Sequence, residues 1–522
     1  MKKEIQDICS FLLALILIAC VNESESHVFY PAQPAQDEII VNTLIIKDNN
    51  GQSYQPFMVD SGNYYILFPF ETNFAAVEFV ANSTVPYIFD NGEKRSSGII
   101  DISDFTKPLR CACIEENGDT VIREIVVFDQ PVMTIVTPDT LPILSKTERK
   151  EGCTVKLIVP NKEVRELGTA GIRGRGNSTW LQEKKPYNVR FDKKIDILGM
   201  KKSKHWILLA NAYYDRTQIH NSTAFEIARK TDFQWVPSGH HVELFLNGEY
   251  RGLYYLCEKI GAEEDKIPLK KANEMMLPSE CGYLLESYVT LEDRIESFAN
   301  NNVSSFFYTG IFTHTGYSPN NCFLGWEIKE PEDYLTDNHV EYIKGELTRV
   351  ERLIMDSERG EYHDFFDIES AINWWLVEEL CLNEEASRTK NVYMYKDGDG
   401  KFTIGPPWDF DAWTFETLSD QDRNWNLNTA FYYSKLFEDP VFKKRLQEKW
   451  NVFKPIWESE IPKYIEEQYN MIHRAAERNE IKWAHWWIYA KYPDVTYREL
   501  IDEMKKSFVE QIQKTDKLIK NL

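Results

Sequence analysis

The sequence predicts an α+β protein in which a small all-β sandwich precedes a larger domain with strands first and helices later. Short alternating apolar segments separated by Asn-Gly turns fill residues 36–130. From residue 131 the pattern is again strand-like, and from about residue 338 it becomes mostly helical. A hydrophobic content of 43% in 522 residues supplies large cores and excludes global disorder.

The N-terminal residues have the form of an export signal. Lys2 and Lys3 precede an apolar run over residues 11–19, which is too short to span a bilayer stably. The run ends at Cys20. We therefore expect residues 1–19 to be a signal peptide.

The tetrapeptide Leu17-Ile18-Ala19-Cys20 resembles a bacterial lipobox, in which the cysteine thiol is acylated. The alternative is an ordinary secretory signal with an incidental cysteine, but no A-x-A cleavage site lies nearby. We expect lipid on Cys20 and a polar tether over residues 20–35. The protein would then be an exported lipoprotein, anchored at the outer membrane or the cell surface.

The charge of the chain limits its partners. A formal net charge of -22 argues against nucleic acid, because the phosphate backbone would be repelled without a large basic patch. The same charge gives the chain no electrostatic attraction to an anionic membrane, so membrane attachment is expected through the lipid on Cys20.

Residues 36–130 carry the pattern of a small β-sandwich. Apolar residues alternate over short runs such as 121–127, and the turns contain Asn-Asn-Gly, Asp-Asn-Gly and Glu-Asn-Gly. Nothing in this range suggests catalysis. By resemblance of class alone, we expect an immunoglobulin-like spacer or binding module.

Strands are expected in the first part of the domain spanning 131–522. They lie at 153–159, 187–191, 242–246 and 250–260, the last two joined by an Asn-Gly turn. A helix is expected from Gln218 to Arg229, with Asp215 as its N-cap.

Helices are expected over 338–355, 370–382 and a long tail from 439 to 522. The tail is rich in aromatic residues, which suits either a carbohydrate-binding surface or a packed core. Helical spacing around Leu436, Phe442 and Leu446 favours the core.

The first group of candidate functional residues is the segment Gly171–Trp180. Its glycines permit close backbone approach, and Arg173, Arg175 and Asn177 offer donors to an anion such as a phosphate. A glycine-rich turn between strands is the alternative, because the segment is neither GxGxxG nor a Walker A motif.

Lys184 and Lys185 follow at the start of the next expected strand, where a fixed ammonium could neutralise a nucleotide phosphate. A solvated charge pair beside a proline is the alternative. Glu226, on the helix expected after Asp215, could pair with one of these lysines, although a solvent-facing glutamate is the commoner outcome.

The third group is the most specific. Asn391 precedes an expected strand, a DGDG turn follows, and Asp409 stands after the return strand. The hairpin should bring the Asn391 amide beside the Asp409 carboxylate. Protein kinases hold magnesium with an asparagine and an aspartate joined in this way, and Asp409-Phe410-Asp411 takes the place of their DFG. The alternative is a turn next to an acidic strand end.

These motifs together resemble the CotH kinase family, the relatives of spore coat protein H. The resemblance covers about residues 131–522 and rests on the order of five segments, GIRGRGNSTW, KKPYNVRFD, LLANAYYDRT, HHVELFLNGEYRGLYYLCEKI and GPPWDFDAW. It implies an atypical, two-lobed protein-kinase fold with a strand-rich N-lobe and a helical C-lobe. It also implies binding of ATP with Mg²⁺ or Mn²⁺, and phosphorylation of serine on the protein itself or on surface proteins.

The resemblance also implies roles for individual residues. Lys184 or Lys185 would contact the α- and β-phosphates, Asn391 and Asp409 would hold the metal, and Asp411 would support them. The kinase pattern places a catalytic aspartate five residues before the metal-binding asparagine, but here that residue is Ala386. Glu385, or Glu384, could supply the missing carboxylate. The expected catalytic set is therefore Glu385, Asp409 and Lys185.

Three functions are compatible with these residues. The first is a lipid-anchored serine kinase. The second is a degenerate kinase that serves as a surface assembly or binding protein, since a misplaced carboxylate slows transfer without abolishing nucleotide binding. The third is a glycosidase using Asp409 with Glu384 or Glu385, which leaves the arginine-glycine loop and the lysines unexplained.

Overall fold

The computed structural model describes residues 44–48, 50–54, 56–59, 63–69, 77–81, 87–89, 94–95, 97–100, 109–114, 120–160, 164–211, 215–263, 265–288, 304–313, 323–415, 427–485 and 494–522. The expected signal peptide, Cys20 and the tether over 20–35 lie outside these residues.

Strands between residues 44 and 128 form two sheets, with the orders β2-β1-β4-β7 and β3-β9-β8-β5-β6. Their pairs are antiparallel except for β3 with β9, which run parallel. The strands are β1 (Leu44–Lys47), β2 (Ser53–Tyr54), β3 (Asn63–Leu67), β4 (Val77–Ala81), β5 (Tyr87–Phe89), β6 (Lys94–Arg95), β7 (Ser97–Ile100), β8 (Leu109–Ile114) and β9 (Thr120–Phe128). The immunoglobulin-like topology stays a prediction.

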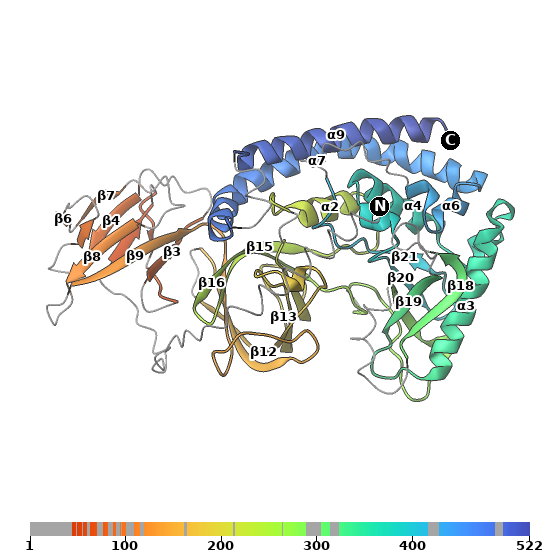
Figure 1. Cartoon of the computed structure of the whole chain (residues 1–522), viewed down its shortest axis with the longest axis horizontal. Coiled ribbons are helices and arrows are strands. Elements are labelled where there is room, and N and C mark those ends of the chain that lie inside the picture. The colour runs from red at the N-terminus through yellow and green to blue at the C-terminus, as the bar shows by residue number, and fades with distance from the viewer. Residues whose placement is uncertain are drawn as a thin grey trace, which may run out of the picture. The chain divides into compact units, whose positions relative to one another are not determined.

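The next strands close into a barrel with the order β10-β11-β12-β13-β14-β16-β15 (Figure 1). Pairing between β10 and β15, which run parallel, completes the ring. Its strands are β10 (Val132–Val136), β11 (Lys150–Ile158), β12 (Arg165–Gly174), β13 (Tyr187–Ile195), β14 (Ser203–Leu209), β15 (Gly239–Leu246) and β16 (Glu249–Glu258).

Alternation along each barrel strand separates a packed interior from an outer face. Ile172, Val189 and Trp206 are paired across β12, β13 and β14, and all three are buried in the barrel core. Ile207, which follows Trp206 on β14, is paired with Cys257 on β16, and both belong instead to the core of the C-terminal half. The outer face of β14 and β16 is therefore an internal surface of the protein.

The Asn-Gly turn behaves as the sequence predicts. Asn247 and Gly248 both have positive φ, of 53° and 81°, and they join β15 to β16. Positive φ at both central residues is what a type I′ hairpin requires.

A 5-stranded sheet of order β18-β19-β17-β20-β21 lies in the C-terminal half. It consists of β17 (Gly282–Tyr288), β18 (Phe306–Thr313), β19 (Phe323–Glu330), β20 (Tyr393–Asp397) and β21 (Thr403–Ile404). The part expected to be helical thus shares a sheet with strands from earlier in the chain. The two-lobed kinase arrangement itself stays a prediction.

The longer helices agree with the predicted positions to within a few residues. They are α2 (His220–Arg229), α3 (Asp337–Met355), α4 (Ile368–Leu380), α7 (Pro440–Lys482) and α9 (Tyr497–Lys520), with short helices α5 (Glu384–Ser387) and α6 (Tyr433–Leu436). The expected single tail is interrupted, because α7 ends at Lys482 and a capping box of Thr496 and Glu499 starts α9. The two helices run side by side (Figure 1).

The aromatic residues of the tail form a core rather than a surface platform. Trp450 and Trp457 on α7 are buried, as are Phe431, Tyr432 and Tyr433 before it. This confirms the core prediction for the described part of the tail. None of the helices described is both long and apolar enough to cross a bilayer.

Candidate functional site

The third group of candidate residues meets in space. The Nδ2 atom of Asn391 donates to Asp409 Oδ2 over 2.5 Å and to Glu385 Oε2 over 3.3 Å. Strands β20 and β21 pair between Asn391 and Asp409, as the hairpin prediction requires. Two carboxylates, 24 positions apart in the sequence, therefore share the amide group of Asn391.

Backbone conformation positions the two ends of this hairpin. Asn391 and Asp409 have left-handed φ angles of 58° and 71°, which asparagine and aspartate tolerate better than most residues. Ser287 on β17 fixes the first end, since its Oγ donates to Thr389 O over 2.7 Å and accepts from Val392 N over 3.0 Å. Sequence reasoning missed Ser287, because nothing local marks a serine on a distant strand.

Glu385 lies on the single turn α5. The Oδ1 atom of Asn383 caps this turn by accepting from the Glu385 backbone N–H over 3.1 Å. The side chain of Glu385 receives Lys390 Nζ on Oε1 over 2.9 Å, so a lysine and Asn391 hold its two oxygens. Ala386 is buried, and Glu384 pairs with Arg388. Of the two glutamates considered, Glu385 is thus the one beside Asp409.

Helix α2 holds the loop that carries Asp409 and Asp411. Asn221 Oδ1 accepts from the Phe410 backbone N–H over 3.0 Å. Thr414 donates its hydroxyl to Phe410 O over 2.6 Å and lies 3.1 Å from Nδ1 of His220. Asp215 in turn accepts from the His220 backbone N–H over 3.1 Å. The prediction of Asp215 as the N-cap is wrong, because α2 begins at His220 with Ile219 as its N-cap and no side-chain cap.

The carboxylates of this site repel one another. Burial raises the pKa of Asp409 above its ordinary value, and the charges of Arg175 and Lys390 oppose that rise. Burial is the main cause of the raised pKa of Glu385, and the charge of Asp409 raises it further. The same two causes raise the pKa of Asp411 well above its ordinary value. A cation among them would relieve this repulsion.

The residues present suit a hard divalent cation such as Mg²⁺ or Mn²⁺. Asp409, Asp411 and Asn391 offer oxygen donors, and magnesium sites commonly use only one or two carboxylates with the rest supplied by phosphates and water. Among the described residues no group of three or more His, Cys, Asp or Glu has metal-binding geometry. Asn391 presents its NH₂ to the carboxylates, so the amide would have to rotate to offer its oxygen.

The glycines of the Gly171–Trp180 segment accommodate side chains of this protein. A Cβ placed on Gly174 would lie 2.2 Å from the Trp180 ring, and one on Gly171 would lie 2.1 Å from Glu151 Oε2. At Gly174 the space is taken by the Trp180 ring, whereas at Gly171 it is taken by the carboxyl end of the exposed Glu151 side chain. Close approach of the backbone to an anion stays a prediction for this segment.

Of the three polar residues predicted to bind an anion in that segment, one lies beside the acidic centre and two have partners in other parts of the chain. The Arg175 guanidinium lies 5.5 Å from the centre of the Trp408 ring, next to Asp409. Arg173 donates Nη1 to Thr147 O over 3.2 Å. Asn177 is exposed and accepts from Lys146 Nζ over 3.3 Å. Of the three, Arg175 is therefore placed nearest to the acidic centre.

Lys184 is fully buried, and the acceptors around its ammonium are neutral. Its ammonium donates to Asn479 Oδ1 over 2.8 Å, to Gln218 Oε1 over 3.3 Å and to the Leu253 carbonyl. Burial lowers the pKa of Lys184 well below its ordinary value. Its three hydrogen-bonding protons all have protein acceptors, so Lys184 has no donor left for a phosphate in this conformation.

Lys185 and Glu226 also have partners other than those that the sequence predicts. Lys185 Nζ donates to Trp180 O over 2.7 Å and lies over the Trp180 ring. The expected pairing of Glu226 with a lysine of this pair is wrong, because its two oxygens bind Arg229 and Lys230 one turn further along α2. Neighbours at i+3 and i+4 on a helix reach a glutamate without any tertiary contact.

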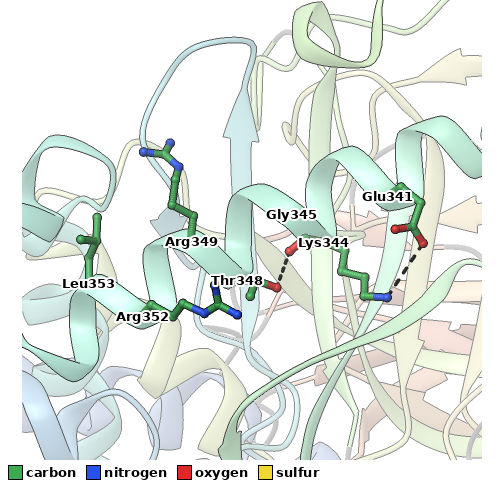
Figure 2. Close-up of a pocket in the computed structure, with 7 residues that line it drawn as sticks. All are labelled: Glu341, Lys344, Gly345, Thr348, Arg349, Arg352 and Leu353. Atoms are coloured by element: carbon green, nitrogen blue, oxygen red, sulfur yellow. Dashed lines mark hydrogen bonds and ion pairs between the residues drawn. The ribbon is translucent and has the colours of Figure 1, made fainter.

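A pocket that does not belong to this site lies along α3. It has a volume of about 490 Å³ and is formed along α3 by Glu341, Lys344, Gly345, Thr348, Arg349, Arg352 and Leu353. Figure 2 shows Lys344 reaching toward Glu341, 3.9 Å away, and Thr348 bonded to the carbonyl of Lys344. None of the candidate site residues lines it.

Comparison with known proteins places the chain in a family. The family model described as CotH kinase protein matches residues 172–507, more than half of the chain. No curated protein matches the sequence. The match spans every candidate residue from Arg173 to Asp411, together with the helices that support them. The chain belongs to the CotH kinase protein family.

Proposed function

We propose that this protein is a kinase that transfers the γ-phosphate of ATP to serine hydroxyls, on itself or on other surface proteins. The observation that carries the proposal is the convergence of the Asp409 and Glu385 carboxylates on the amide of Asn391. It unites in one place the two metal-binding residues of the kinase pattern and a carboxylate able to act on a hydroxyl.

In this proposal Asp409, Asn391 and Asp411 hold the divalent cation, whose charge offsets that of the phosphates. Glu385 orients the serine hydroxyl and takes its proton as the hydroxyl oxygen bonds to phosphorus and the bond to ADP breaks. The cation matters for Glu385 as well. It offsets the charge of Asp409, which helps to raise the pKa of Glu385, and so favours the ionised form that a base requires.

The test is transfer of labelled γ-phosphate by the purified protein with Mg²⁺ or Mn²⁺. We expect Glu385→Gln to lower the transfer rate by roughly a hundredfold or more, because the proton acceptor is lost. Glu384→Gln is the matched variant and should cost much less, since Glu384 pairs with Arg388. If the wild-type protein transfers no label under either metal, the enzyme proposal fails.

A second candidate function is that of a pseudokinase serving as a surface assembly or binding protein. One observation favours it, namely that Lys184 is enclosed by neutral acceptors instead of facing the acidic centre. Under this alternative ATP with a divalent metal would raise the melting temperature, because a ligand that binds the native state stabilises it, while label transfer would stay absent.

We also propose that the protein works outside the cytoplasm, attached to a membrane by lipid on Cys20. The support is the lipobox-like sequence that ends at this residue. Labelled palmitate should be incorporated by cells that express the wild type and lost in Cys20→Ser, which should also leave the membrane fraction. Incorporation that persists in Cys20→Ser would contradict the lipid site.

A further inference from the structure

A group of cationic side chains lies on the outer face of the barrel. Alternation along β12 places Ile172 inside and Arg173 outside. Strand pairing sets Arg190 opposite His205, and Trp206 opposite Glu258. Lys259, which follows Glu258, therefore comes beside His205 on the same face as Arg173.

These cations lie close enough together for each to disfavour the charged form of the others. Burial lowers the pKa of Lys259 to about 8, and the charges of Lys329, Arg173 and Arg149 add to the effect. Burial and the charges of Arg173 and Arg190 lower the pKa of Arg149 to about 10. The chain as a whole has a net charge of -22, so a cluster of mutually repelling cations stands out in it. A bound anion would balance the repulsion within the cluster.

Protein acceptors satisfy this cluster only in part. Among the described residues, the buried Nε of Arg173 has no hydrogen-bond partner. Arg149 reaches the carbonyl of Gly171 at a long 3.4 Å. The acidic neighbour common to Lys259 and Arg149 is Glu332. Lys184, by contrast, has all its donors occupied.

The cluster adjoins the acidic centre on two sides. Arg175, two positions beyond Arg173, has its guanidinium 5.5 Å from the centre of the Trp408 ring, and Trp408 directly precedes Asp409. Lys329 binds Glu286 Oε2 over 3.1 Å, and Glu286 is paired on the neighbouring strand with Tyr393, two positions after Asn391. A ligand with a metal-bound end at Asp409 could thus extend its other phosphates toward the cations.

We propose that Lys259, together with Arg149 and Arg173, binds the phosphate chain of a nucleotide. Lys259 takes the role that sequence reasoning assigned to Lys184 or Lys185. The inference rests on the proposed function in treating the polyphosphate as part of ATP. The shared chemistry is that of a polyphosphate, so free tripolyphosphate should occupy the same cations.

The experiment measures equilibrium binding by calorimetry, with Mg²⁺ and without turnover. The probes are a non-hydrolysable ATP analogue, tripolyphosphate and adenosine. In Lys259→Gln we expect the affinities for the analogue and for tripolyphosphate to fall at least about tenfold, because a charge-assisted hydrogen bond is lost. Adenosine binding should not change, and Lys259→Arg should retain most of the phosphate affinity.

The matched control is Lys193→Gln, which removes the same charge from an exposed position on β13 and should leave all three affinities unchanged. Melting temperatures without ligand show that each variant is folded. The inference is overturned if Lys259→Gln binds tripolyphosphate as wild type does, if it loses adenosine equally, or if Lys184→Met alone loses phosphate affinity. It is also overturned if the wild type binds no polyphosphate. A wild type that binds through Lys259 but transfers no phosphate removes the kinase proposal and leaves this inference standing.

Discussion

Replacing Asp409 by asparagine should reduce phosphate transfer by roughly a thousandfold, while the protein stays folded. The change removes one negative charge from the proposed metal site and keeps the size of the side chain. The hydrogen bond from Asn391 Nδ2 to Oδ2 of this residue can persist through the new amide oxygen. The rate of label transfer at saturating Mg²⁺ measures the effect.

Asp409→Asn should also be more stable than wild type when no metal is present. The carboxyl pKa values of Asp409, Asp411 and Glu385 are raised in the folded protein, so their ionised forms oppose folding. Their contribution therefore favours folding at acid pH and falls as pH rises through the folded pKa values. The stability difference between variant and wild type should grow with pH, as urea unfolding in EDTA would show.

The matched control is Asp399→Asn, in the exposed DGDG turn of the same hairpin. It makes the same chemical change and should alter neither the transfer rate nor the pH dependence of unfolding. If Asp409→Asn transfers phosphate at the wild-type rate, Asp409 does not hold the metal. If it is destabilised at neutral pH, the carboxylates are balanced by a protein cation instead of repelling one another.

Arg478→Met should destabilise the protein by about 3–5 kcal/mol, the usual cost of breaking a buried ion pair from one side. Arg478 on α7 donates Nη2 to Asp129 Oδ1 over 3.0 Å and to Glu243 Oε1 over 2.6 Å. All three side chains are buried, and methionine would fill the space without a charge. Two carboxylates would then lie inside the protein without this partner.

The loss should be smaller at acid pH. Burial already raises the pKa of Glu243 in spite of Arg478, and removing the arginine should raise it further, so protonation below that value relieves the unpaired charge. Arg474→Met is the control, since Arg474 is 3.8 Å from Asp129 Oδ2 and partly exposed; it should cost no more than about 1 kcal/mol. Urea unfolding at pH 5 and pH 8 distinguishes the variants. Equal losses for both would mean that the buried network does not hold α7 to the barrel.

Features of the site that depend on nearby residues were predictable from the sequence. The hairpin between Asn391 and Asp409 follows from a turn motif between two short strands, and it brings the amide and the carboxylate together as expected. Helix α2 and the Asn247-Gly248 turn were predictable for the same reason. Glu385 was one of two candidates, and the turn of α5 decides between them by directing Glu384 to Arg388.

Partners far apart in the sequence were not predictable. The pattern KK before a strand does not reveal that Lys184 is buried against Asn479, almost 300 residues later, nor that Glu226 turns to Arg229 and Lys230. Lys259 stands near the end of the segment HHVELFLNGEYRGLYYLCEKI, which assigns it no role by itself, and only the pairing of β14 with β16 sets it beside His205.

The sequence by itself therefore determined the α+β class, the family resemblance, the order of the motifs and the pairing of the Asn391 amide with the Asp409 carboxylate. Each of these rests on periodicity, turn residues or motif order, which act over a few positions. The tertiary structure decided the closed barrel, the shared sheet and the partners of Lys184 and Lys185. The physical reason is that burial and charge depend on neighbours brought together by folding, so the same lysine can be a buried hydrogen-bond donor or a free cation at a site.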